Sequence, residues 1–241
     1  MTTDLTDLPA GPGPLRTLIQ TRYLDRLVAS DRGRAFLLAF MADAERSDEQ
    51  MVFDTLLARV DDPELHKLVR IHRDDEERHG EILEACLRRV GATPPAVPDA
   101  LRFIFRLDAE LDGFAAEFVE GRRGVMEAYV LLQVIEERAV VQYPGIERAL
   151  RRVDPHAADV VARVVEDERR HVRYARAISR RYAKDADTLA RTLARFRRAE
   201  ATAFAAHGQA FLRFATDHDL LAVGWPEKLL WRALGAAPAR A

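Results

Sequence analysis

The sequence predicts an all-α fold, a four-helix bundle built from two duplicated helical hairpins with additional helices at its N- and C-terminal ends. The first observation is an internal repeat, because a shift of 92 residues without gaps superimposes Asp62-Pro63 on Asp154-Pro155. The second is that each Asp-Pro pair reads as an N-cap followed by proline in the first helical turn, which marks the start of a hairpin's second helix. The third is that apolar residues recur in steps of three and four, the spacing of an amphipathic helix. The same shift also matches Arg46 with Arg138, Gln50 with Gln142, Arg59 with Arg151 and Val69 with Val161.

The composition indicates one globular domain. The chain has 241 residues, of which 48% are hydrophobic and 32% charged, enough for a single helical domain over residues 15–241 after a flexible tail over residues 1–14. Lys plus Arg (37) nearly balance Asp plus Glu (39), so charge gives no argument for binding nucleic acid or a membrane surface. We find no signal core and no run of about 18 apolar residues, which predicts a cytoplasmic protein without a membrane span.

The helices of the first hairpin are expected in the following order. After the tail, a short helix over 15–29 precedes a longer helix over 33–60. The next helix runs over 63–90, because its apolar and ligand-type residues follow one seam, and Gly91 supplies its C-terminal stop. That seam consists of Leu65, Val69, His72, Glu76, His79, Leu83 and Cys86. Residues 92–98, which include three prolines, form the crossover to the second hairpin.

The second half of the chain repeats this plan with added segments. Its expected helices cover 99–120, 124–143, 155–183 and 189–214, followed by an apolar stretch over 220–234. The first of these is expected to lie across the bundle. Pro144-Gly145 is expected to break or kink the next helix before a short continuation to Arg152. Pro226 splits the last apolar stretch.

Two segments of the form Asp-Glu-x-Arg-His occur, one in each copy of the repeat. They are Asp75-Glu76-Glu77-Arg78-His79 and Asp167-Glu168-Arg169-Arg170-His171, and a glutamate, Glu45 or Glu137, precedes each motif glutamate by 31 residues. Residues three apart share a helix face, so each motif offers one carboxylate and one imidazole to the same side. The preceding glutamate lies as far from the hairpin tip as the motif does, roughly 21 Å at about 1.5 Å per residue, so the two meet at one height.

Together these residues predict a dinuclear metal site inside the bundle. Without metal, six acidic or imidazole side chains would lie on apolar seams, where unpaired charges are strongly disfavoured. Two divalent cations remove that penalty, because four carboxylates and two such cations neutralise each other. The predicted metal ligands, which are also the predicted catalytic residues, are Glu45, Glu76, His79, Glu137, Glu168 and His171.

Two glutamates leave alternatives open. Glu136 competes with Glu137 because adjacent helical residues point about 100° apart and only one of them can face inward. The repeat favours Glu137. Glu49 lies one turn after Glu45 and could reach the metals, but its counterpart in the repeat is Val141, which favours a solvated side chain. Three tyrosines near the helix seams could supply redox-active phenols or could only pack; they are Tyr129, Tyr143 and Tyr174.

The order Glu, Glu-x-x-His, Glu, Glu-x-x-His resembles the pattern of the ferritin-like superfamily of dinuclear-carboxylate proteins. The resemblance covers about residues 36–181 and implies a ferritin-like domain with a ligand-bearing bundle over about 33–183. It implies two terminal carboxylate ligands, two bridging carboxylates and one histidine for each metal. These are, in that order, Glu45 and Glu137, Glu76 and Glu168, and His79 and His171.

The Asp-Glu-x-Arg-His form is similar to that of the bacterial multicomponent monooxygenases, and its Asp-Glu start is similar to that of ribonucleotide reductase. By that resemblance, Asp75 and Asp167 hold the histidines of the opposite hairpin through their other ring nitrogen, rather than lying on the helix surface. His72, one turn before Glu76, is either an extra ligand or a core histidine. An additional histidine one turn before the motif glutamate occurs in the arylamine N-oxygenases of this superfamily, but on the hairpin where this chain has Val164.

The resemblance implies an enzyme, a non-haem di-iron oxidoreductase that activates dioxygen to oxidise or hydroxylate a small organic substrate. The expected cofactor is a pair of iron ions, with manganese or a mixed Fe/Mn pair as alternatives. Cys86 is the one cysteine and cannot build a rubredoxin-type site, so an external electron donor is expected, and the protein is expected to be a monomer or small homo-oligomer. The alternatives are a rubrerythrin- or bacterioferritin-like ferroxidase, peroxidase or iron-storage protein, and a dimanganese catalase. The sequence leaves the substrate open.

Overall fold

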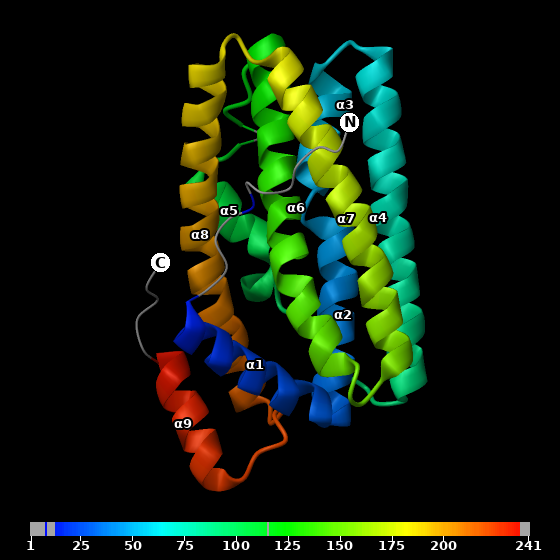
Figure 1. The fold of residues 1–241 in the computed structure, drawn as a ribbon, viewed down its shortest axis with the longest axis vertical. Coiled ribbons are helices and arrows are strands. Elements are labelled where there is room, and N and C mark those ends of the chain that lie inside the picture. Colours follow the sequence, from blue (N-terminus) through cyan, green and yellow to red (C-terminus); the bar gives the residue numbers. More distant parts are fainter. Residues whose placement is uncertain (1–7, 9–12, 115, 237–241) are drawn as a thin grey trace.

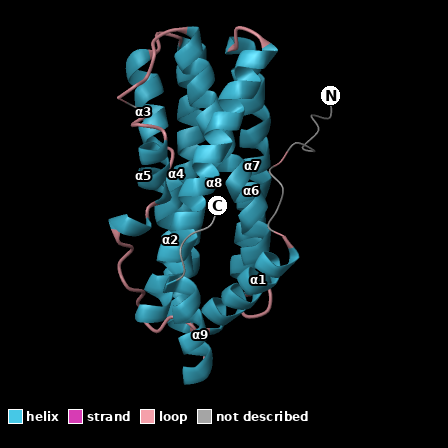
Figure 2. Cartoon of the chain, turned by 90° about the vertical axis from the view of Figure 1, so that its left-hand side faces the viewer, coloured by secondary structure: helices cyan, strands magenta, loops and turns pink. Residues whose placement is uncertain are grey.

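All regular elements in the described part of the chain are helices, which confirms the predicted all-α class (Figures 1 and 2). The computed structural model describes residue 8 and residues 13–114 and 116–236. The predicted tail over 1–14 therefore lies outside the described residues except at positions 8, 13 and 14. None of the described helices combines the length and the apolar character that crossing a membrane requires.

Four helical rods stand side by side in Figure 1. The first rod consists of α2 (Asp31–Ser47) and α3 (Gln50–Arg59), and the others are α4 (Pro63–Val90), α6 (Arg122–Leu150) and α7 (Pro155–Tyr182). The rods α2 and α4 pack against each other, as do α6 and α7, and α4 also packs against α7. The tips of the two hairpins lie at opposite ends of the bundle, since the α3–α4 turn is at the top of Figure 1 and the α6–α7 turn at the bottom.

The predicted Asp-Pro starts are present at both hairpin tips. The Asp62 side chain accepts hydrogen bonds from the backbone N–H groups of Glu64 and Leu65, and α4 begins at Pro63. The Asp154 side chain accepts one from the N–H of Ala157. These contacts satisfy N–H groups that the first turn of a helix leaves without an intrahelical acceptor.

Further helices cover one side and one end of the bundle. They are α1 (Pro14–Ala29), the 3-10 helix η1 (Asp99–Leu101), α5 (Phe103–Glu110), α8 (Ala186–Asp217) and α9 (Trp225–Ala236). The long helix α8 packs against α5 and α6, α1 packs against α2 and α6, and α9 packs against α8. Residues 91–98 contain no helix, as expected of the crossover. Pro226 lies in the first turn of α9, where the apolar stretch over 220–234 passes from a non-helical segment into a helix.

The expected single helix over 99–120 is wrong. It is replaced by η1, α5 and a loop, because the chain turns back after α5. The Asp108 side chain accepts a hydrogen bond from the backbone N–H of Phe114 at 2.7 Å, and Asp112 and Gly113 adopt positive φ values of 61° and 85°. Left-handed backbone at two successive positions cannot continue a right-handed helix.

Two other helix boundaries also differ from expectation. The helix expected over 33–60 is interrupted at Asp48 and Glu49, where the Glu49 carbonyl accepts from the N–H of Val52 and begins α3 with a tighter turn. Pro144, in contrast, does not end α6, which continues to Leu150. Proline removes one backbone hydrogen bond there, but buried residues on both sides of it, such as Val140 and Leu150, keep α6 packed in the bundle.

The apolar core is divided into two clusters. The first apolar cluster contains Val52, Leu65, Ile135 and Ala175 among others, and the second contains Ala42, Leu83, Ala149 and Val161 among others. On every rod the buried members of the two clusters are separated by a gap. The gap covers residues 43–51 on α2–α3, 70–82 on α4, 136–148 on α6 and 162–174 on α7. All the predicted metal ligands lie in this gap.

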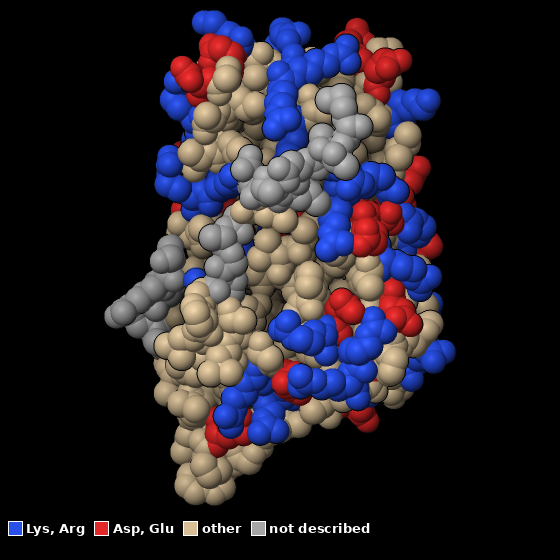
Figure 3. All heavy atoms as spheres, in the orientation of Figure 1, with Lys and Arg blue, Asp and Glu red and all other residues tan. Residues whose placement is uncertain are grey.

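The surface carries charges of both signs. On the face drawn in Figure 3, basic and acidic side chains are interspersed rather than gathered by sign. Around α9, at the lower left of that view, few charged atoms are visible, and Trp225, Leu229 and Leu230 are 75%, 54% and 54% exposed.

Candidate metal centre

Acidic and imidazole side chains meet in the gap between the two apolar clusters. Nine of them are buried there, each 7% exposed or less, and eight of these nine, with at least one from every rod, gather in one cluster. The eight are Glu45 and Glu49 from the first rod, His72, Glu76 and His79 from α4, Glu136 from α6, and Glu168 and His171 from α7. Spacings of three and four residues place the members from one rod on a single helix face.

One group of four offers ligand atoms within 4.8 Å of one another: Glu45, Glu76, His79 and Glu168. At its centre is His79 Nδ1. It lies 3.1 Å from Glu45 Oε2, 3.3 Å from Glu76 Oε2 and 3.2 Å from Glu168 Oε1. Three rods therefore direct an oxygen toward one imidazole nitrogen.

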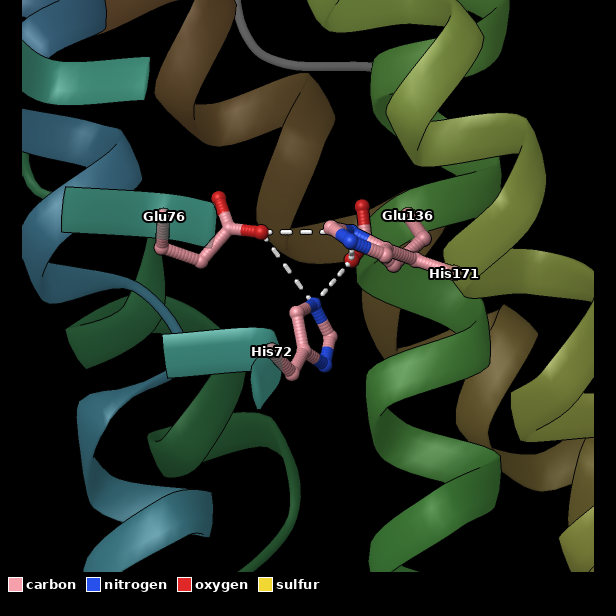
Figure 4. A group of neighbouring side chains, drawn as sticks. All are labelled: His72, Glu76, Glu136 and His171. Atoms are coloured by element: carbon pink, nitrogen blue, oxygen red, sulfur yellow. Dashed lines mark hydrogen bonds and ion pairs between the residues drawn. The ribbon is translucent and has the colours of Figure 1, made fainter. Parts of the chain in front are cut away.

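A second group consists of His72, Glu76, Glu136 and His171 (Figure 4). Glu136 Oε1 lies 2.7 Å from His72 Nε2 and 2.9 Å from His171 Nδ1. Glu76 Oε1 lies 3.2 Å from each of the same two nitrogens. Figure 4 shows the two histidines and two glutamates pointing toward one another from α4, α6 and α7.

Glu76 and Glu168 link the two groups. Glu76 directs Oε2 to His79 in the first group and Oε1 to His171 in the second. Glu168 directs Oε1 to His79, at 3.2 Å, and Oε2 to His171, at 2.9 Å. Each carboxylate thus divides its two oxygens between the groups, which is the geometry of a carboxylate that bridges two cations.

The arrangement of the carboxylate oxygens and imidazole nitrogens fits bound cations better than it fits hydrogen bonds between these side chains. His79 Nε2 faces Asp167 at 3.2 Å, so an N–H donated there leaves Nδ1 as a lone pair directed at three carboxylates. Glu76 Oε1 and Glu168 Oε1 are buried without accepting a hydrogen bond. Two ligands at right angles around a metal bonded at about 2.1 Å lie about 3.0 Å apart, close to the separations seen here. A cation in each group would satisfy these atoms.

Asp75 and Asp167 cross between the hairpins. His171 Nε2, on α7, lies 3.4 Å from Asp75 Oδ2 on α4, and His79 Nε2, on α4, lies 3.2 Å from Asp167 Oδ2 on α7. The hydrogen bond from His171 holds the pKa of Asp75 below its usual range. This is the crossed arrangement that the resemblance implies.

Two arginines close this outer layer. Arg78 lies 2.6 Å from Asp75 and 3.0 Å from Asp167, and Arg170 lies 2.8 Å from Asp75 and 3.0 Å from Asp167. The four side chains tie α4 to α7 at the level of the centre. They also fix which nitrogen of each histidine faces inward.

The structure corrects the choice between the neighbouring glutamates of α6. Glu136, not Glu137, points to the cluster. Glu137 is fully buried elsewhere and lies 2.7 Å from Arg176 and 2.8 Å from Arg197, while Gln133 donates a hydrogen bond to it at 2.8 Å. Its carboxylate pairs α6 with α7 and α8 instead of lining the centre.

The physical reason is the length of the hairpin connections. Glu45 lies 14 residues before the end of α3 at Arg59, and Glu136 lies 14 residues before the end of α6 at Leu150. Two residues then precede the N-cap of α4, but three precede that of α7. The repeat without gaps conceals this extra residue, which moves the inward-facing position by one.

Glu49 and His72 both lie at the centre. The expectation that Glu49 is solvated is wrong, because its side chain is buried and its Oε2 lies 3.0 Å from His72 Nε2. The spacing of four residues from Glu45, and of His72 from Glu76, was the signal for both positions.

The three tyrosines differ in their relation to the cluster. The Tyr143 hydroxyl donates a hydrogen bond to Glu45 Oε1. The Tyr174 ring packs edge-on against His72 and His171, with centroids 5.4 and 5.7 Å away. Tyr129 belongs to the first apolar cluster. Only the first two therefore contact residues of the centre.

Burial dominates the electrostatics of the cluster. It raises the pKa of Glu45 to about 8 and the pKa values of Glu49 and Glu136 well above the usual range. Burial also acts against the charge of Glu76, but the three histidines that face it hold its pKa well below the usual value. In the absence of a cation the carboxyls must share protons, since so many like charges cannot be buried together.

Comparison of the chain with protein-family models, curated proteins and solved structures finds no match. The function has to be argued from the site itself.

Proposed function

We propose that the chain is a ferritin-like dinuclear metalloenzyme that activates dioxygen and oxidises a small organic substrate. The observation that carries the proposal is the division of the Glu76 and Glu168 oxygens between two groups of ligand atoms. One mononuclear site would not require either carboxylate to face two ways. The arrangement of two hairpins around this centre supports the ferritin-like assignment.

The donor set favours iron, with manganese or a mixed pair as the alternatives. The buried donors are carboxylate oxygens and imidazole nitrogens, and the described residues place no thiolate among them. Hard carboxylates suit iron and manganese in their oxidised states, whereas zinc and copper sites are typically richer in histidine or sulfur. When bound, such a pair supplies electrons to dioxygen that side chains alone cannot supply.

The chain's own residues orient the histidine ligands, hold a proton near the metal position and limit the access of water. Asp75 and Asp167 orient the two inner histidines, so that Nδ1 of each faces the metal position. Tyr143 holds a hydroxyl proton at Glu45 Oε1, on a carboxylate that would be a metal ligand. The two apolar clusters border the site on both sides and would limit the access of water to it.

A ferroxidase of the rubrerythrin or bacterioferritin type is the second candidate. It is favoured by the symmetry of the outer layer, where Asp75 with Arg78 repeats as Asp167 with Arg170. A dimanganese catalase would use nearly the same ligands. Because the described cysteine is single and buried, the electrons that an oxygenase needs for repeated turnover would come from a separate donor, whereas a ferroxidase would take them from the ferrous iron that it oxidises.

Oxygen uptake by the iron-loaded protein tests the proposal. The apo protein is loaded with ferrous iron without air, its metal is counted by elemental analysis, and oxygen uptake is followed with increasing iron. We expect two ions per chain, uptake that stops once the bound iron is oxidised, and renewed uptake when a chemical reductant is added. Glu76→Ala should lose the pair, whereas Glu77→Ala, the neighbouring exposed glutamate on α4, should retain it.

The other outcomes decide between the functions. Continued oxidation of tens of ferrous ions per chain into a soluble mineral would replace the oxygenase with an iron-storage protein. Rapid release of oxygen from hydrogen peroxide by the manganese-loaded form alone would favour the catalase. Failure to bind two metal ions would overturn the dinuclear assignment itself.

A further inference from the structure

One half of the centre has ligands that the other half lacks. Glu49 and His72 are 4% and 2% exposed; His72 belongs to the second group, and Glu49 lies beside it. In the second hairpin, with the one-residue shift on α6, their counterparts are Val140 and Val164, which cannot bind a metal. The two hairpins therefore differ at two positions that face the cluster.

The contacts of His72 are those of a metal ligand. Its Nε2 lies 2.7 Å from Glu136 Oε1, 3.0 Å from Glu49 Oε2 and 3.2 Å from Glu76 Oε1. One nitrogen cannot donate a proton to three oxygens. Neither oxygen of Glu49 accepts a hydrogen bond, although both are buried. Two atoms that lie about 3.0 Å apart without being directed at each other have the relation of neighbouring ligands around one cation.

The numbers of ligands differ accordingly. The second group supplies two imidazole nitrogens and two carboxylates, from His72, His171, Glu76 and Glu136. Two further carboxylate oxygens adjoin it, because Glu168 Oε2 lies 2.9 Å from His171 Nδ1 and Glu49 Oε2 lies 3.0 Å from His72 Nε2. Around His79 stand one imidazole nitrogen and three carboxylate oxygens, from His79, Glu45, Glu76 and Glu168. A six-coordinate ion would be complete in the first position and would keep two places open in the second.

We propose that the two metal positions are unequal. Glu49 and His72 make the position beside His171 a closed site that retains its ion. The position beside His79 is the open site, which exchanges its ion and binds small anions or dioxygen. The inference rests on the dinuclear centre of the proposed function and adds that its two metal positions have different roles. Tyr143 stands on the open side, because its hydroxyl contacts Glu45. The residue that can deliver a proton is thus placed where an incoming ligand binds.

Cobalt(II) provides a test that does not depend on activity. The apo protein is titrated with Co²⁺ against a competing chelator, and the d–d absorption is recorded at each step. We expect two steps, the first at least roughly 10-fold tighter than the second, since even an outer partner of a ligand changes affinity by roughly 10- to 100-fold. Azide added after the first equivalent should leave the spectrum unchanged, and azide added after the second should change it.

Variants identify the residues responsible. Glu49→Gln, which conserves size, and Glu49→Val with His72→Val, which copies the second hairpin, should weaken the first step by roughly 10- to 100-fold or more. Glu45→Gln should weaken only the second step. His66→Gln is the matched control, because His66 also lies on α4 but contacts the Val60 carbonyl away from the centre. Circular dichroism of each apo variant checks that it is folded.

The results separate this inference from the function. Two equal cobalt steps, an unchanged first step in Glu49→Gln, or an azide response in the one-cobalt form would overturn the inequality. Binding of two cobalt ions in two steps by a protein whose iron form does not consume oxygen would leave the inequality standing and overturn the oxidase. A wild-type protein that binds no metal would overturn both.

Discussion

Glu136 and Glu137 are neighbours in sequence, yet substitutions at the two positions should have opposite effects. Glu136 faces two histidines in the cluster, whereas Glu137 pairs with Arg176 and Arg197 between α6, α7 and α8. Glu137→Gln should therefore reduce stability without changing the number of metal ions bound. Glu136→Gln should reduce metal binding without lowering the stability of the apo protein.

The size of the stability loss follows from burial. Removing one partner of a buried ion pair costs about 3–5 kcal/mol. The Glu137 side chain is fully buried and Arg176 is 11% exposed, but Arg197 is 29% exposed and can turn toward water, which places the loss at the low end. A loss of about 3 kcal/mol corresponds to a fall in Tm of about 6–12 °C for a chain of this length.

Calorimetry and metal analysis of the same samples provide the measurement. Both variants are melted as apo and metal-loaded protein, and bound metal is counted. Adding Arg197→Gln to the Glu137→Gln variant should lower Tm by less than Arg197→Gln lowers it in the wild type, because the ion pair between the two residues is already gone. If Glu137→Gln lost a metal ion while its apo Tm stayed within a degree or two of the wild type, the placement of both glutamates would be refuted.

Three further outcomes are expected. Asp75→Asn and Asp167→Asn should each keep the helical content measured by circular dichroism and weaken metal affinity by roughly 10- to 100-fold, and unchanged affinity would return both to a surface role. Loaded protein in free metal at about 100 times Kd should be more stable than apo protein by about 2.7 kcal/mol per site in denaturant unfolding, and equal stability would contradict a site formed only in the fold. Burial lowers the pKa of His207 to about 4, so its neutral form stabilises the fold fully above the unfolded pKa of about 6.5, and this contribution is lost as the pH falls toward 4. The variant His207→Phe should lose about 3 kcal/mol less than the wild type over that interval, and an equal loss would show that His207 is not buried in its neutral form.

The fold was predictable where short-range signals determine it. Asp62-Pro63 and Asp154-Pro155 specify helix starts through their own side chains, and the observed helices begin there. The loop after α5 was not predictable in the same way. Its turn depends on the Asp108 side chain, which reaches a backbone N–H six residues later, and residues 103–120 contain no proline to signal the break.

In the candidate site, too, the residues placed by short-range spacing were predictable, and the residue placed by the length of a connection was not. Glu76 with His79 and Glu168 with His171 each lie on one helix, where a spacing of three residues determines a shared face irrespective of the rest of the fold. The ligand-type residue of α6 depends instead on the length of a hairpin connection. A difference of one residue in that turn rotates the helix by about 100° relative to its partner, and this exchanges Glu137 for its neighbour.

The position of the centre between two apolar clusters has a consequence for the metal-free protein. On each rod the two clusters stop on either side of the same level, so in the absence of cations the packing there consists largely of acidic and imidazole groups that share protons, with a few valines such as Val140 and Val164. The ion pairs of Arg78 and Arg170 with Asp75 and Asp167 continue to join α4 to α7 at that level, because they do not depend on the metal for their charge balance. The two clusters are also large enough to keep the helices packed above and below it. Metal removal should therefore loosen the middle of the bundle first, and the amides of residues 70–82 and 162–174 should gain hydrogen exchange before those of either cluster. Uniform loss of protection along α4 and α7 would mean that the metal supports the whole fold rather than this layer.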